Sequence, residues 1–430
     1  MISLFSIKKY SSNFTALILI AVILCTLPTI VGCCSKSSSE AVEGEKIKLV
    51  FWNTMEGLEA AAMSGILREF SNANPQIEVE EILIEFYKAR EKFKESVKSD
   101  SGPDLLRADR FWIPDFASAD IVSEIKRSVV KEEYEDMVPL ARDFVSWQDK
   151  MWAMPISVDC LALFYNKKHF ASNNVKVPIN FDEFLVAAQK LTDRNSGRYG
   201  FFIYPNGWYF EPFFFGFGGQ YFAPDGSLAI RSDAATKAFE YLLHLKDRLK
   251  AVPPVNLRAK IYNTMINGFG SGQVSMIFTG PWAIRSIING TDFKRDNSNL
   301  GIAQLPAGPH GTFSPTGCQT IVISKKSKHQ EAALKFARYM FSYEAQKKLV
   351  MANYGMPARK SVFAAPELKQ DPYIQVFIKQ LQMSRKANVS QFQGDIYAPL
   401  GDKLKDVLNG DLTPEYAIND IIAEWKANHK

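Results

Sequence analysis

The feature that most constrains the fold is an alternation of short apolar runs and helix-spaced segments that begins near residue 47. Residues 47–52 form an apolar run typical of a buried strand, 58–71 carry apolar residues at helical spacing, and 77–83 alternate as a strand does. A strand, a helix and a strand in this order form a βαβ unit, whose two strands run parallel in one sheet. The sequence therefore predicts an α/β fold with a parallel sheet.

The same alternation continues to the end of the chain. Asn180 with Glu183 three residues later forms a capping-box pattern, and Thr413 precedes another helical segment as a cap. Further strands are predicted at 104–106, 154–165, 274–278 and 320–324, and further helices at 88–99, 329–341, 343–351, 400–408 and 414–427.

The N-terminal segment resembles a bacterial lipoprotein signal. Lys8 and Lys9 precede the apolar run 14–24, and the small residue Gly32 stands directly before Cys33. We interpret residues 1–32 as a signal peptide, Cys33 as the lipidated first residue, and the polar stretch 33–45 as a flexible tether. The alternative is an uncleaved membrane anchor, since 14–32 is long enough to cross a bilayer. Either interpretation places the folded part outside the cytoplasm, held at the periplasmic or outer face of a bacterial membrane.

The size and composition of the chain after Cys33 limit its architecture and the kinds of site that it can contain. About 395 residues remain after Cys33, which is more than one compact core usually holds, so two lobes are expected. Basic and acidic residues are interspersed, which argues against a nucleic-acid-binding protein. Only Cys160 and Cys318 lie in the folded part, and we expect two unpaired, buried thiols. The five histidines are far apart in sequence, and we predict neither a metal site nor a cofactor.

Several short segments, in order along the chain, resemble one family: the extracellular solute-binding proteins of ABC importers, of the maltose-binding type. The resemblance runs from about residue 47 to the C-terminus, and the order and spacing of the segments carry it. They are LVFW (49–52), GPDLL (102–106), DRF (109–111), LFYNK (163–167), EPFF (211–214), GPWA (280–283), LPAGP (305–309) and MPAR (356–359).

The resemblance implies a fold of the type II periplasmic-binding-protein class, with two α/β lobes, a hinge and a ligand cleft between the lobes. It implies a protein that is not an enzyme, acts as a monomer, and delivers a carbohydrate to the permease of an ABC transporter. The expected N-terminal lobe comprises 46–157 and 316–361, and the expected C-terminal lobe comprises 158–310 and 365–430.

The family's sugar contacts can be transferred by position. Carboxylates and a cation bind the hydroxyl rim of a sugar, and flat aromatic rings cover its C–H face. Competing interpretations stay open: Glu56 as a helix cap, and Trp208 or Trp282 as core packing. The transferred polar positions are Glu56, Asp109, Arg110, Asp159 and Glu211, the stacking positions are Phe213 and Trp282, and Trp208 and Tyr397 complete the set.

One departure from the family bears on the ligand. Where the maltose-binding protein has a stacking Trp before a Tyr, this chain has Ile396 before Tyr397, which favours a short oligosaccharide such as a maltose-type disaccharide. The segment 51–57 is also similar to glycerol-3-phosphate and glycerophosphodiester binding proteins. Those ligands require an arginine, and Tyr397 occupies its position here, so Arg359 or Arg385 would have to replace it.

An enzyme is the alternative from a different class. Glycoside hydrolysis requires two opposed carboxylates, and two of the acids at the transferred positions could supply them. The sequence has no nucleophile elbow, Walker loop or zinc-protease motif, so a binding protein is preferred.

Overall fold

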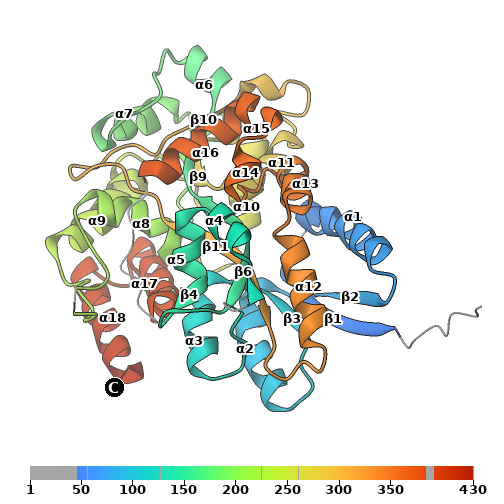
Figure 1. Ribbon diagram of the computed structural model, residues 1–430. Coiled ribbons are helices and arrows are strands. Elements are labelled where there is room, and N and C mark those ends of the chain that lie inside the picture. The colour runs from blue at the N-terminus through green and yellow to red at the C-terminus, as the bar shows by residue number, and fades with distance from the viewer. Residues whose placement is uncertain are drawn as a thin grey trace, which may run out of the picture. The chain divides into compact units, whose positions relative to one another are not determined.

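The computed structural model describes residues 46–55, 57–125, 128–223, 225–259, 261–383 and 392–429 (Figure 1). Two predicted functional residues, Cys33 and Glu56, lie outside the described residues, as do the predicted signal peptide and the whole predicted tether. The roles predicted for them stay predictions.

The first of two main sheets contains the predicted βαβ unit. Strand β1 pairs in parallel with β2 and β3, and α1 (Gly57–Ala73) connects β1 to β2. Strand β11 pairs antiparallel with β3 and β6, so the sheet is mixed and the prediction of a parallel sheet is correct only for its first three strands. The strand order is β2 (Ile77–Leu83), β1 (Ile47–Asn53), β3 (Leu105–Asp109), β11 (Thr316–Ile323) and β6 (Ala153–Cys160).

The second sheet has four strands. Strand β7 pairs antiparallel with β9 and β10, while β8 is parallel to β9. Its order is β10 (Leu300–Ala303), β7 (Ala162–Asn166), β9 (Val274–Thr279) and β8 (Tyr199–Phe201). A separate short hairpin pairs β4 (Ser146–Trp147) with β5 (Lys150–Met151).

The apolar run 154–165 is where the chain passes from the first sheet to the second. The prediction of a single strand here is wrong, because β6 ends at Cys160 and β7 begins at Ala162 in the other sheet. Leu161 lies between them, and its backbone N–H donates to the Ser314 hydroxyl at 2.8 Å. Ser314 belongs to the return passage from β10 to β11, so the two passages between the sheets are joined by a buried hydrogen bond.

Helices pack on both sheets (Figure 1). Those in contact with the first sheet are α1, α2 (Phe86–Lys98), α5 (Pro139–Val145) and α12 (Gln330–Met340). Those in contact with the second sheet are α6 (Lys167–Ser172), α7 (Phe181–Leu191) and α10 (Tyr262–Gly270), while α16 (Pro372–Met383) contacts both sheets. Helices α8 (Gly207–Gly216), α9 (Asp233–Leu243), α17 (Tyr397–Asn409) and α18 (Pro414–Asn428) pack on one another.

The remaining helices complete the described chain. They are α3 (Ile113–Ser118), α4 (Lys131–Asp136), α11 (Ile284–Ile288), α13 (Tyr343–Asn353), α14 (Lys360–Phe363) and α15 (Pro366–Gln370). Single turns are η1 (Arg110–Trp112), η3 (His244–Arg248), η4 (Pro281–Ala283), η5 (Asn297–Asn299) and η6 (Gln393–Ile396).

Both predicted helix caps are confirmed. The Asn180 side chain accepts from the Glu183 backbone N–H at 2.9 Å, and the Glu183 carboxylate accepts from the Ile179 N–H at 3.1 Å. Thr413 accepts from the Tyr416 N–H at the start of α18. These side chains satisfy backbone donors that the first helical turn leaves without a partner.

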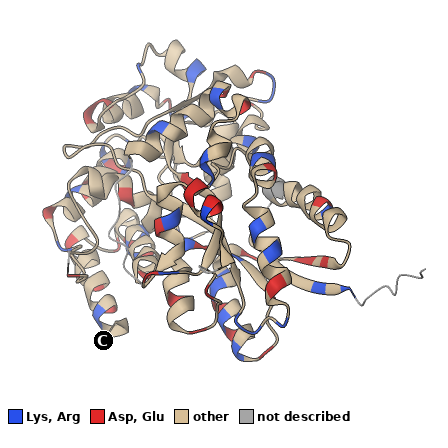
Figure 2. Cartoon of the chain, in the orientation of Figure 1, with Lys and Arg blue, Asp and Glu red and all other residues tan. Residues whose placement is uncertain are grey.

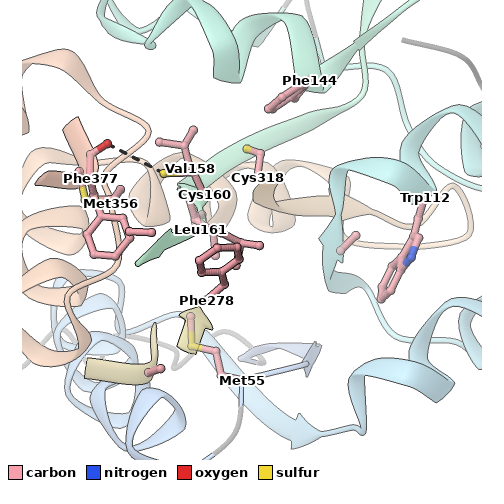
Figure 3. Packing of buried hydrophobic residues seen from close by; sticks show 14 of the residues in the cluster. Met55, Trp112, Phe144, Val158, Cys160, Leu161, Phe278, Cys318, Met356 and Phe377 are labelled. Atoms are coloured by element: carbon pink, nitrogen blue, oxygen red, sulfur yellow. Dashed lines mark hydrogen bonds between the residues drawn. The ribbon is translucent and has the colours of Figure 1, made fainter. Parts of the chain in front are cut away.

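The two cysteines of the folded part are free thiols in the core, as expected (Figure 3). Cys160 ends β6 and Cys318 lies on the neighbouring β11, both fully buried among apolar side chains. Burial raises the pKa of each thiol well above its ordinary value. Both therefore stay protonated and serve as small core residues.

Charges of both signs are interspersed over the elements (Figure 2). Within the part of the chain that the structure describes, no helix is long and apolar enough to cross a membrane.

Candidate functional site

Two predicted residues, Asp109 and Arg110, stand where β3 runs into the turn η1. Asp109 accepts from the Phe111 backbone N–H at 2.9 Å and from the Gln319 side-chain amide at 3.0 Å. Burial raises the pKa of Asp109, while these hydrogen bonds and the neighbouring Arg110 act in the opposite direction.

Arg110 is held rigidly, with only 5% of its surface exposed. Its guanidinium carbon lies 3.8 Å from the centre of the Phe111 ring and 3.7 Å from that of Phe144, and its Nε donates to the Thr316 carbonyl at 3.0 Å. The aromatic faces and the carbonyl fix the position of the cation without neutralising it.

Glu211 and Tyr397 complete a polar cluster with Asp109 and Arg110. Glu211 lies on α8, is 3% exposed, and accepts a hydrogen bond of 2.7 Å from the hydroxyl of Tyr397, the first residue of α17. The Tyr397 ring stands edge-on to Phe111 at 5.1 Å between centres. Burial raises the pKa of Glu211 to about 8, although the Tyr397 hydrogen bond and the charge of Arg110 both lower it. We call Asp109, Arg110, Glu211 and Tyr397 the polar cluster.

Asp159 lies beside this cluster. It stands on β6 opposite Gly317 of β11, and a Cβ atom added to Gly317 would lie only 2.0 Å from the Asp159 Oδ1 atom. The glycine therefore makes room for the carboxylate to lie over the neighbouring strand. On β11, Gly317 stands opposite Asp159 and Gln319 stands opposite Asp109, so Cys318 lies between the positions that face the two acids.

Trp208 and Trp282 form an aromatic pair close to Glu211. Asn206 caps α8 by accepting from the Trp208 N–H at 2.9 Å, which places Trp208 one helical turn before Glu211. The two indole rings are 5.9 Å apart at an angle of 43°. Trp282 lies in η4 and folds back over Gly280, where an added Cβ would meet its ring at 1.9 Å. Both tryptophans keep part of their surface exposed.

The structure does not bring Phe213 into this group. Its side chain is 3% exposed and is stacked on Phe278 at 5.3 Å, with Phe181, Phe201 and Tyr241 around it. A stacking role for Phe213 stays a prediction, and this packing gives it no support, because the ring is already covered on both sides by core residues.

Three tyrosines that are not among the predicted site residues extend the aromatic pair. Tyr262 accepts a hydrogen bond of 2.7 Å from the Trp282 indole N–H, and the Tyr204 ring lies 5.6 Å from Tyr262 and 4.8 Å from Tyr209. A signal existed for Tyr204, which precedes the loop-like Pro205–Asn206–Gly207. Tyr262 begins α10 and has no such signal.

The arrangement combines hydroxyl-binding groups with flat apolar rings. The acids of the polar cluster accept from hydroxyls, Arg110 donates, and the indoles offer faces for C–H groups. No group of three or more His, Cys, Asp or Glu side chains suited to a metal occurs among the described residues. Groups of these kinds can bind a hydroxylated, uncharged molecule.

Comparison with known proteins identifies the family. The family model described as "Bacterial extracellular solute-binding protein" matches residues 53–347, about two thirds of the chain. The chain belongs to this family. The resemblance derived from its short motifs is therefore confirmed.

Individual relatives agree with this assignment. The chain is 24% identical over 382 residues to the maltotriose-binding protein of Pyrococcus abyssi, covering 85% of this chain and 79% of the relative. It is 27% identical, with a TM-score of 0.84, to the GacH receptor of Streptomyces glaucescens, whose structures were determined unliganded and with acarbose, covering 89% of this chain and 98% of the receptor. A solute-binding protein of Thermotoga lettingae with bound α-D-tagatose is similar at a TM-score of 0.80 and 24% identity, over 88% of this chain and 98% of that one.

These structures confirm the predicted fold class. The family members and the two mixed sheets with their helices agree on two α/β lobes. The predicted lobe boundaries and the ligand contacts of individual residues are not tested by the similarity and stay proposals.

Proposed function

We propose that this protein captures a neutral carbohydrate, such as a maltose-type disaccharide, and delivers it to the permease of an ABC importer. The observation that carries the proposal is the position of Trp208 and Glu211 one turn apart on α8. Trp282 packs on Trp208, and the Tyr397 hydroxyl donates to Glu211. A stacking surface and a hydroxyl-binding acid thus lie side by side, as the two kinds of sugar surface require.

The ligands of relatives support the carbohydrate class. The relatives named above are described with maltotriose, acarbose and tagatose. Their variety argues that the family's framework is kept while the contacting side chains change. The loss of a stacking Trp at Ile396 therefore bears on ligand length rather than on ligand class.

The phosphate alternative is weaker, because the described arginines that would serve it are already engaged. Arg359 donates to the Asp136 carboxylate at 2.5 Å, to the Ser361 hydroxyl at 3.1 Å and to the Phe341 carbonyl at 3.2 Å. Around Arg110 the acids Asp109 and Glu211 compete with an anionic ligand. Arg385 lies outside the described residues.

Membership of a family of solute-binding proteins supports a binding role rather than catalysis. We further propose that residues 46–157 with 316–361, and 158–310 with 365–430, form lobes that close on the ligand about a hinge. The proposed assembly is a monomer, lipidated at Cys33 and held at the membrane beside its permease. Mass spectrometry of the native N-terminus tests the anchor: we expect a lipidated Cys33, and a chain that retains residues 14–32 would contradict it.

A thermal-shift screen tests the proposed ligand class. A ligand that binds the native state raises the melting temperature with its concentration, so we expect shifts with maltose, maltotriose or another neutral sugar. Glycerol-3-phosphate and a glycerophosphodiester serve as the contrasting ligands. A shift with the phosphates and none with any sugar would reject the proposal. Release of shorter sugars during prolonged incubation would reject the non-enzymatic role.

A further inference from the structure

A cluster of charged side chains joins elements of the two proposed lobes, outside the set of predicted ligand contacts. Arg90 of α2 belongs to the proposed N-terminal lobe, and its Nη1 atom lies 2.7 Å from an oxygen of Asp395. Asp395 lies in η6 of the proposed C-terminal lobe. The two side chains are only 23% and 27% exposed, so salt and water screen this ion pair less than they screen an ion pair on the open surface.

Each member of this ion pair has a second partner within its own proposed lobe. Arg90 donates from Nε to the Asp115 carboxylate at 3.0 Å, and Lys94 pairs with the same carboxylate at 2.9 Å. On the other side, an Asp395 oxygen lies 3.2 Å from Nε2 of His429. If the lobes separate, neither Arg90 nor Asp395 becomes a buried charge without a partner, which is the costly result of breaking a buried pair. The contact between Arg90 and Asp395 can therefore open and close at a modest cost.

The ion pair lies close to the candidate site along the chain and in space. Asp395 stands two residues before Tyr397, whose hydroxyl donates to Glu211 at 2.7 Å. Turn η6 also packs on η1, since a Cβ atom added to Gly394 would lie 3.0 Å from the Cβ atom of Phe111. An interaction that holds η6 against the first lobe thus also holds Tyr397 beside the polar cluster.

We propose that Arg90 and Asp395 form a latch, which joins the two lobes while a sugar is bound and slows the release of that sugar. The latch rests on the proposed carbohydrate function and on hinge closure, and it adds to them the pair of residues that sets the lifetime of the closed form. An interaction made in the closed form alone raises the population of that form, and with it the apparent affinity for the ligand. The latch acts on this balance and not on the choice of sugar.

A double-mutant cycle tests the latch. Calorimetry and stopped-flow tryptophan fluorescence measure affinity and dissociation rate with whichever of glucose, maltose and maltotriose binds the wild type most tightly. We expect Arg90→Gln and Asp395→Asn each to weaken binding about three- to tenfold, mainly through faster dissociation. Because the two residues act through one interaction, the double variant should bind no more weakly than the weaker single variant.

Lys94→Gln is the matched control. Lys94 is 24% exposed, close to the value for Arg90, and its ion pair with Asp115 lies within one proposed lobe. This variant should bind sugar as the wild type does. The unliganded melting temperature of Asp395→Asn should stay close to that of the wild type, since the latch joins the lobes only in the closed form.

The outcomes separate the latch from the proposed function. Wild-type affinity and dissociation rate in both single variants, effects that multiply in the double variant, or equal weakening in Lys94→Gln would each overturn the latch and leave carbohydrate binding standing. A large fall in the unliganded melting temperature of Asp395→Asn would assign the ion pair to the fold and also overturn the latch. A wild type that binds none of the three sugars overturns the proposed ligand class and the latch together.

Discussion

At the scale of single residues, Glu211 carries the most unusual electrostatics of the site. Its carboxyl is 3% exposed, accepts from Tyr397, and has a pKa raised to about 8. In the unfolded chain the same group titrates near 4.5. The folded protein therefore holds this proton more tightly than the unfolded chain does, and the stability that results is fully present below pH 4.5.

We predict that the free energy of unfolding falls by on the order of a few kcal/mol as the pH rises from about 4.5 to about 8, because this contribution of Glu211 is lost. Glu211→Gln keeps the shape of the side chain without the proton equilibrium, so the variant should lose less stability than the wild type over this range. Urea unfolding of both proteins at pH 5, 7 and 9 measures the difference. Parallel pH profiles would show that Glu211 titrates as an exposed carboxyl does.

Trp282 is expected to bind ligand rather than to hold the fold. Trp282→Ala should weaken sugar binding by about 1–3 kcal/mol through lost apolar contact, as measured by calorimetry. Trp425→Ala is the matched control. Trp425 belongs to α18 and packs on Phe222, not on the aromatic pair. Unchanged affinity in Trp282→Ala would assign this ring to packing alone.

A comparison of single residues shows which parts of the candidate site could be predicted from the sequence. Asp109 and Glu211 were assigned to the site by position, from the resemblance to the family, and no local pattern in the sequence singled them out. Phe213 was grouped with the stacking rings because it matches a stacking position of the family, and a matched position does not show which way a side chain faces.

At the scale of elements, the turn from β9 into η4 is shaped to hold Trp282. The indole ring lies over Gly280, and an added Cβ would lie 1.9 Å from the ring. Gly280→Ala should therefore displace Trp282 and weaken sugar binding about tenfold, equivalent to about 1.4 kcal/mol. Calorimetry compares it with Gly65→Ala, where the nearest atom to an added Cβ is a side-chain nitrogen at 3.9 Å. Equal affinity in the two variants would mean that the ring needs no such support.

Elements with a clear period were predictable from the sequence. Strand β1, helix α1 and strand β2 were predicted to within a few residues because each has its own apolar period. The run 154–165 was predicted as one strand because every residue suits a buried strand, and nothing in its composition states that β6 and β7 belong to different sheets. Sheet membership depends on long-range pairing with β11 and β9.

At the scale of the whole molecule, the length of the chain predicted two lobes, whereas their boundaries and their closure on a ligand were predicted from resemblance to a family and not from any local pattern. Arg90 of α2 forms ion pairs with Asp115 at 2.8 Å and with Asp395 of η6 at 2.7 Å. Since Arg90 and Asp395 belong to different proposed lobes, a hinge motion would change the second ion pair. We predict that saturating sugar lowers the radius of gyration measured by small-angle scattering, because the ligand favours the closed form. An unchanged radius at saturation would contradict closure.

The most direct test of the account is calorimetric titration of maltotriose and glycerol-3-phosphate into the wild-type protein at low and moderate salt. The site pairs acids and neutral rings with one fixed cation, so we predict binding of the sugar with an affinity that changes little with salt, since no net charge is neutralised. Binding of glycerol-3-phosphate that weakens as salt rises, together with no heat from the sugar or from any other neutral carbohydrate, would contradict the central claim.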